Sequence, residues 1–104
     1  MTFYALEKLI DMHDGYKKAF KVAGRDLLLV QENGKAYLMT NSCPHMGVSL
    51  STATVEPQGI IRCRAHGIEF ELESGRALGP LANTLACLHK FNIVYDGAYL
   101  GIDV

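Results

Sequence analysis

The sequence predicts an all-β fold, and two observations carry this prediction. Short apolar or alternating runs follow one another along the 104 residues, and no stretch longer than two turns has the periodicity of an amphipathic helix. Turn signals separate the runs, among them Asn33-Gly34 and Asp96-Gly97, which accept the positive φ angles of tight hairpins. Short strands at this spacing indicate an antiparallel β-sandwich or a small barrel, in which each strand buries one face.

The first four strands are expected at residues 3–8, 17–22, 27–31 and 35–40. The second and third are joined by an Ala-Gly-Arg-Asp turn, and the third and fourth by Asn33-Gly34. Consecutive antiparallel hairpins follow from these turns.

Four more strands are expected at residues 59–62, 68–72, 90–95 and 98–102. The connector Glu73-Ser74-Gly75 follows the second of these, and Asp96-Gly97 joins the last two. Since no internal repeat, low-complexity tract or linker interrupts the chain, residues 1–104 are expected to form one domain.

Composition excludes several classes of function. Ten basic and eleven acidic side chains give a formal net charge of -1, so no uniform field draws the chain to nucleic acid or to an anionic membrane. The longest apolar runs are far too short to span a bilayer, and the N-terminus lacks a basic region followed by an apolar core, so a cytoplasmic location is expected. Three cysteines cannot all pair in one chain, which favours thiolate chemistry or metal binding for some of them.

The interval 41–58 breaks the rhythm of strands and turns, and it carries half of a ligand set. Cys43-Pro44-His45 lies in it, and Cys63-Arg64-Ala65-His66 follows after seventeen intervening residues. Two thiolates and two imidazoles from two loops can bind an iron–sulfur cluster or zinc. Two thiolates suit one iron and two imidazoles the other, which is the asymmetric arrangement of a Rieske centre.

On these motifs the sequence resembles the Rieske ferredoxin family over nearly its whole length, especially the soluble ferredoxins of bacterial aromatic-ring oxygenase and multicomponent monooxygenase systems. Matching flanking positions are Gly47, Gly67, Phe70, Gly75 and Pro80. The resemblance implies a Rieske domain with a small cluster-binding subdomain at about 41–80.

The resemblance also implies one 2Fe–2S cluster with four ligands. Cys43 and Cys63 would hold the buried iron, and His45 and His66 the outer iron. The chain would carry single electrons from a flavin-dependent reductase to a terminal oxygenase, docking as a monomer by the His45 and His66 edge, with no catalysis of its own.

The family's high-potential members carry a loop-to-loop disulfide and a hydroxyl donor to a cluster sulfur, but the matching positions here are Val48, Ala65 and Ile68. Fewer hydrogen bonds to sulfur stabilise the reduced state less. We therefore expect a potential near roughly -150 mV, in the low part of the Rieske range.

Alternatives remain open at this point. The chain can be a Rieske-like small subunit of a larger redox enzyme such as nitrite reductase, or a zinc-stabilised interaction module. A catalytic non-haem iron site is excluded, because His13 and His89 lack the arrangement of two histidines and a carboxylate.

Cys87 is expected to be a small buried hydrophobe without a role. Arg62, Arg64 and Arg76 are candidates either for pairing with acidic partner residues or for solvated surface charges.

Overall fold

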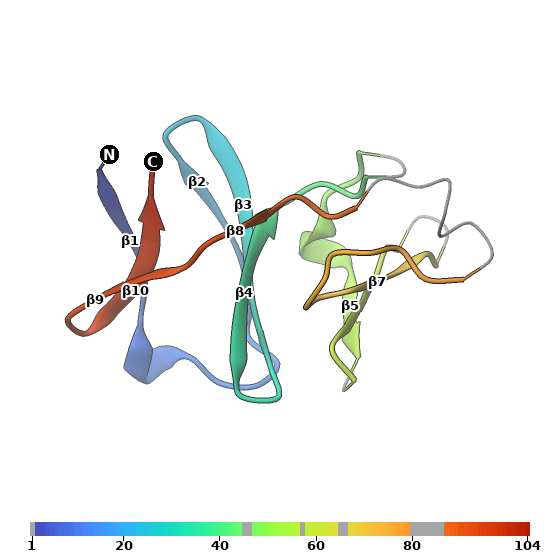
Figure 1. Ribbon diagram of the computed structural model, residues 1–104, viewed down its shortest axis with the longest axis horizontal. Coiled ribbons are helices and arrows are strands. Elements are labelled where there is room, and N and C mark those ends of the chain that lie inside the picture. The colour runs from blue at the N-terminus through green and yellow to red at the C-terminus, as the bar shows by residue number, and fades with distance from the viewer. Residues whose placement is uncertain (1, 45–46, 57, 65–66, 80–86) are drawn as a thin grey trace.

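The computed structural model describes residues 2–44, 47–56, 58–64, 67–79 and 87–104, and within them it is built of antiparallel sheets (Figure 1). The strands are β1 (Phe3–Lys8), β2 (Lys17–Val22), β3 (Arg25–Glu32), β4 (Lys35–Thr40), β5 (Thr54–Glu56), β6 (Ile60–Arg62), β7 (Glu69–Glu71), β8 (Lys90–Phe91), β9 (Val94–Asp96) and β10 (Tyr99–Asp103). Helix in the described ranges is confined to two short 3-10 turns, η1 (Leu9–Asp11) and η2 (Leu50–Thr52). The predicted all-β fold class is therefore confirmed.

The central sheet has the order β2-β3-β4-β8. Tight turns make its first two hairpins: Ala23 and Gly24 have φ angles of 51° and 78°, and Asn33 and Gly34 have φ angles of 53° and 76°. Strand β3 lies between β2 and β4, and its residues Leu27 to Val30 are fully buried. A continuous apolar run is what a strand covered on both faces requires.

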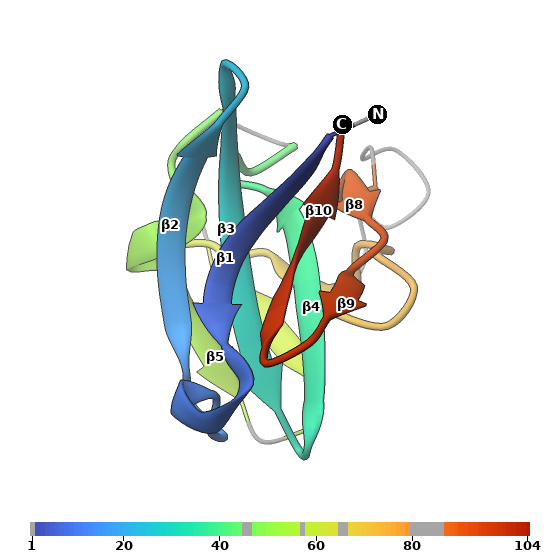
Figure 2. The ribbon, with the colours of Figure 1, turned by 90° about the vertical axis from the view of Figure 1, so that its left-hand side faces the viewer.

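A second sheet, with the order β1-β10-β9, covers one face of the central sheet (Figure 2). Leu27, Leu29 and Leu38 of the central sheet share a buried cluster with Leu100 and Ile102 of β10. This core fixes the N- and C-terminal strands of the chain against the central sheet.

The third sheet, β5-β6-β7, lies at the opposite end of the molecule in Figure 1. A second buried cluster joins the other face of the central sheet to this unit, with Leu28 and Met39 on one side and Ile61 and Phe70 on the other. The molecule is thus a row of three sheets with extents of 42 × 28 × 20 Å, and the central sheet forms a wall of both cores.

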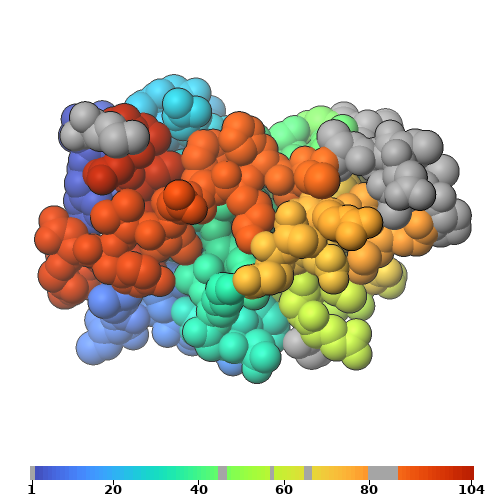
Figure 3. Space-filling model, in the orientation of Figure 1, coloured from blue at the N-terminus to red at the C-terminus, as the bar shows by residue number. Residues whose placement is uncertain are grey.

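The structure corrects two element predictions. The strand expected at 90–95 is two strands, because the chain pairs with β4 at Lys90–Phe91 and then crosses to pair with β10 at Val94–Asp96. In the space-filling view, the orange segment after Cys87 crosses the teal surface of β4 on this path (Figure 3). Strand β5 lies inside the interval 41–58, for which the sequence predicted no strand.

Candidate metal centre

The first candidate loop leaves the central sheet where β4 ends. The backbone N–H of Cys43 donates to the carbonyl of Val48 at 2.8 Å, and the N–H of Gly47 donates back to the carbonyl of Cys43 at 2.7 Å. Gly47 has a φ of 71°, a left-handed conformation that suits glycine. These two hydrogen bonds turn the chain tightly around Cys43.

The second candidate loop joins β6 to β7 and repeats this pattern. The N–H of Cys63 donates to the carbonyl of Ile68 at 2.8 Å, and the N–H of Gly67 donates to the carbonyl of Cys63 at 2.9 Å. Gly67 has a φ of 67°. Both loops therefore hold their cysteine with the same two hydrogen bonds at the same spacing, as two halves of one site require.

Both cysteines are buried, each with 1% of its surface exposed, and both belong to the core cluster that contains Phe70 and Leu72. Two sulfurs delivered by matched loops into one apolar core fit a group that binds thiolates and needs shielding from water. Four other positions that the sequence singled out lie outside the described residues: His45, Ala65, His66 and Pro80.

A third segment packs beside these loops after β7. The N–H of Leu88 donates to the carbonyl of Gly75 at 2.7 Å, and a Cβ on Gly75 would stand 3.0 Å from the carbonyl oxygen of Leu88. Gly75 also has a φ of 79°, so glycine is required there by both space and conformation. Cys87, next to this contact, is exposed, and the expectation that it is buried was wrong.

The charge of Arg62, at the base of the second loop, is paired within the chain. The Arg62 guanidinium lies 3.1 Å from carboxylate oxygens of Glu56 and of Glu69. A hydrogen bond between the two carboxyl groups raises the pKa of Glu56 and lowers the pKa of Glu69, with Arg62 lowering the pKa of Glu69 further. Arg62 therefore has acidic partners before any other protein approaches.

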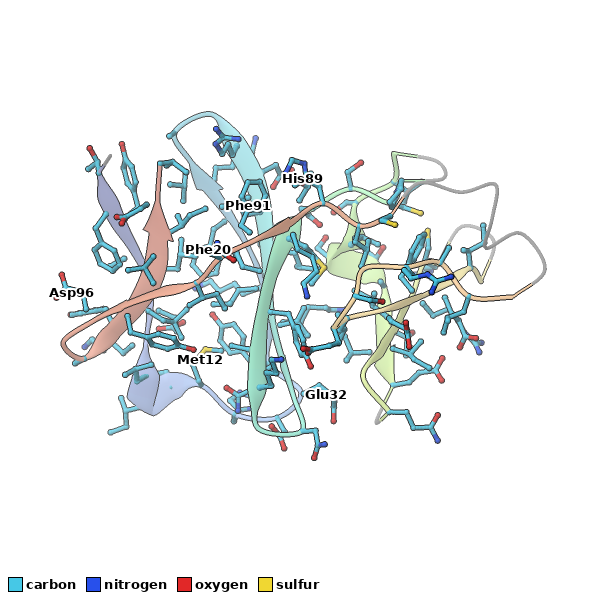
Figure 4. All side chains as sticks on the ribbon, in the orientation of Figure 1. Met12, Phe20, Glu32, His89, Phe91 and Asp96 are labelled. Atoms are coloured by element: carbon cyan, nitrogen blue, oxygen red, sulfur yellow. The ribbon has the colours of Figure 1, made fainter. Side chains whose placement is uncertain are left out.

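His13 and His89, which the sequence did not indicate as ligands, make contacts with aromatic rings and backbone. His89 stacks on Phe91 with ring centroids 4.8 Å apart (Figure 4). His13 packs edge-on against Tyr16, and its Nδ1 lies 3.0 Å from the carbonyl oxygen of Asp14. Aromatic packing and a local backbone contact account for both rings.

Two matched loops with a buried cysteine pair define a protein that binds its cofactor between two loops. Comparison with known protein families identifies which kind it is. The family model described as Rieske [2Fe-2S] domain matches residues 2–92, and the chain belongs to this family, whose cofactor is a Rieske 2Fe–2S cluster. It is 33% identical over 87 residues to the ferredoxin component of the alkene monooxygenase system of Xanthobacter autotrophicus, covering 84% of this chain and 69% of that protein. It is accordingly an electron-transfer protein of the ferredoxin type rather than a catalytic subunit.

Solved structures share the fold. The ferredoxin of carbazole 1,9a-dioxygenase from Nocardioides aromaticivorans superimposes with a TM-score of 0.83 at 20% identity, covering 98% of this chain and 97% of that one. A Sphingomonas yanoikuyae ferredoxin gives 0.84 at 19% identity, covering 99% of each. A ferredoxin solved in complex with the oxygenase of carbazole 1,9a-dioxygenase gives 0.83 at 20% identity, covering 96% of this chain and 91% of that chain. In the part of this chain that the structure describes, no helix is long and apolar enough to cross a membrane.

Proposed function

We propose that this chain carries single electrons from a flavin-dependent reductase to a terminal oxygenase, on a 2Fe–2S cluster bound by Cys43, His45, Cys63 and His66. The observation that carries the proposal is the pair of matched loops, each holding one buried cysteine with the same two backbone hydrogen bonds. In the sequence each loop also contains one histidine, so each supplies one ligand to each iron.

Each part of the site has a separate task in this proposal. Cys43 and Cys63 bind the inner iron within the core, where Phe70 and Leu72 exclude water. His45 and His66 bind the outer iron and form the edge through which a partner receives the electron. When bound, the cluster supplies a one-electron couple whose potential lies above that of all-cysteine clusters, because two imidazoles replace two anionic thiolates.

The monooxygenase ferredoxin supports an oxygenase as the acceptor, because that relative is by name a component of a multi-protein oxygenase system. In this proposal the chain works as a monomer in the cytoplasm and docks each of its two partners transiently at the same edge. We assign the cluster-binding subdomain to residues from about 41 to 80, a range that contains η2 and the whole β5-β6-β7 sheet.

Spectroscopy of anaerobically purified protein tests the cofactor and its ligands. The expected result is a red-brown protein with about two irons per chain and, after dithionite, a rhombic EPR signal whose average g lies below that of all-cysteine clusters. A colourless protein that contains zinc and resists reconstitution with iron and sulfide would contradict the proposal and favour a zinc-stabilised module.

Reduction kinetics and size-exclusion chromatography then test the carrier role. A monomer that is reduced by a flavin-dependent reductase and reoxidised by a terminal oxygenase supports the carrier. Copurification in a stable stoichiometric complex with a larger redox enzyme would instead support the subunit alternative.

A further inference from the structure

Asn41 is the only buried polar or charged side chain among the described residues, with 7% of its surface exposed, and it lies two positions before Cys43. Its backbone N–H donates to the carbonyl of Asp26 at 2.8 Å, and its Nδ2 lies 3.4 Å from a carboxylate oxygen of the same residue. Asp26 belongs to β3, so these contacts attach the start of the first loop to the central sheet.

The other end of the loop is attached to the same side chain. The Ser49 hydroxyl donates to Asn41 Oδ1 at 3.1 Å, and Ser49 directly follows Val48, whose carbonyl accepts the N–H of Cys43. The Asn41 carboxamide therefore connects the two ends of the loop that carries Cys43 and His45. We call Asn41 and Ser49 the loop clamp.

The two cysteine loops differ in what closes their bases. Arg62 and Glu69 flank it and are paired in the β6–β7 ladder, so backbone hydrogen bonds close its base. Strand β4 ends at Thr40 and η2 begins at Leu50, and no ladder pairs the described residues between them, 41–44 and 47–49. The two loops have the same backbone hydrogen bonds but different supports. A ladder closes the second loop, and a half-buried side-chain hydrogen bond closes the first.

We infer that Asn41 is a positioning residue that, through Ser49, holds the Cys43 loop in register with the Cys63 loop, so that both loops present their ligands to one cluster. The inference rests on the proposed function, because it assumes that the two loops share a 2Fe–2S cluster. The Asn41 side chain is buried, so water cannot replace the Ser49 hydroxyl as a donor to Asn41 Oδ1. Loss of this hydrogen bond therefore costs more free energy than it would at the surface.

The test compares Ser49→Ala, Asn41→Ala and the double variant with wild type and with the control Glu69→Gln. Glu69 follows Cys63 by as many residues as Ser49 follows Cys43, so the two positions correspond. Removal of the Glu69 charge leaves the backbone ladder between β6 and β7 in place. Three measurements are made on the iron-loaded proteins: the rate of cluster loss to a chelator, the g values of the reduced cluster, and the midpoint potential.

Ser49→Ala is expected to lose the cluster on the order of tenfold faster than wild type, as the cost of an unpaired buried amide oxygen predicts. Asn41→Ala removes the amide and its contact to Asp26 as well, so it should lose the cluster at least as fast, and both variants should show shifted g values and potential. The double variant should be no worse than the more severe single variant, because the two residues act as one unit. Ser49→Thr, which keeps the hydroxyl, should restore wild-type behaviour, and Glu69→Gln should stay within about twofold of wild type.

Clamp variants that unfold at lower temperature but keep wild-type g values, potential and cluster-loss rate would overturn the inference and leave Asn41 a purely structural residue. Effects of Ser49→Ala and Asn41→Ala that simply add would also overturn it. If Asn41→Ala does not fold, the comparison of Ser49→Ala with Ser49→Thr decides. A wild-type protein that binds no 2Fe–2S cluster would contradict the proposed function, which is a separate result.

Discussion

Individual cysteines in this chain have different environments, and this difference leads to the first prediction. Cys43 and Cys63 are each 1% exposed within one core, whereas Cys87 is exposed to solvent. We expect Cys63→Ser to abolish the visible absorption and to reduce bound iron from about two per chain to nearly none, because one of the four proposed ligands is lost. Iron analysis and the absorption spectrum measure this.

Cys87→Ser serves as the matched control for that substitution. It makes the same chemical change at an exposed thiol, so iron content and absorption should equal those of wild type. A loss of iron in Cys87→Ser comparable to that in Cys63→Ser would show that the ligand set had been assigned to the wrong thiols.

At the residue scale, the sequence could indicate which cysteines belong together but not which side chains are buried. Cys43 and Cys63 are recognisable in the sequence because each has a histidine at ligand spacing, and the structure brings the two cysteines into one core. The burial of Cys87 was predicted wrongly, because an apolar run in the sequence does not say whether anything covers it. The clamp residue Asn41 was missed, since one asparagine in a polar loop gives no signal of its burial.

Among the elements, the pairing of β1 with β10 depends on one glycine. A Cβ on Gly101 would stand 2.0 Å from the carbonyl oxygen of Tyr4 and 2.9 Å from the Phe3 ring, so the strands cannot approach as they do with any larger residue. We expect Gly101→Ala to lower the free energy of unfolding by about 3 kcal/mol. Chemical denaturation measures the loss.

The control is Ala98→Ser, at an exposed position just before β10, which should change the free energy of unfolding by less than about 0.5 kcal/mol. An equally small effect of Gly101→Ala would mean that β1 can move aside without cost.

The Asp14 carboxylate connects the segment before β2 to the β3–β4 hairpin, and it predicts that the free energy of unfolding depends on pH. Asp14, between β1 and β2, accepts the N–H of Gly34 at 2.8 Å and the Gln31 side chain at 3.2 Å, and these hydrogen bonds lower the pKa of Asp14. A carboxyl group with a lowered pKa in the folded state contributes stability that is present above its unfolded pKa of about 3.9 and is lost as the pH falls through the folded value. Wild type should therefore be more stable than Asp14→Asn at pH 7, and the difference should shrink below about pH 4.

Urea denaturation of both proteins across this pH range measures the difference. The same change at Asp96, in the exposed β9–β10 hairpin (Figure 4), is the control for the removal of a surface carboxylate. A difference between wild type and Asp14→Asn that stays constant from pH 7 to pH 3 would exclude a role for the Asp14 charge.

Element prediction was accurate for strands with tight turns and poor where pairing partners change. The first four strands and their two hairpins were confirmed because Ala23-Gly24 and Asn33-Gly34 mark both turns locally. The break between β8 and β9 was missed, since apolar alternation continues through residues 92–93 while the chain moves from one sheet to another. Periodicity records that a strand face is buried, but not which sheet covers it.

For the molecule as a whole, the central sheet is the shared wall of two cores. Leu28 and Leu29 are neighbours on β3, yet Leu28 packs with both buried cysteines and Leu29 packs with β10. Polar contacts also join the central sheet to the segments that flank the β5-β6-β7 sheet: the Lys17 ammonium donates to the carbonyl of Ala53, and Lys35 pairs with Glu73. Since one sheet serves both cores, neither should survive the loss of the other, and the three layers should unfold together.

Leu29→Ala tests this coupling from the core that lacks the cysteines. Removing a fully buried leucine should lower the free energy of unfolding by roughly 2–5 kcal/mol. If the layers are cooperative, the loss of cluster absorption and the loss of strand signal in circular dichroism should move to lower urea by the same amount, with one midpoint for both probes. Leu28→Ala, the neighbouring change on the cysteine side, should give the same coincidence. A Leu29→Ala protein that keeps its visible spectrum after part of its strand signal has melted would show that the cluster end is stable without the terminal strands, and the central sheet would then separate the two cores rather than couple them.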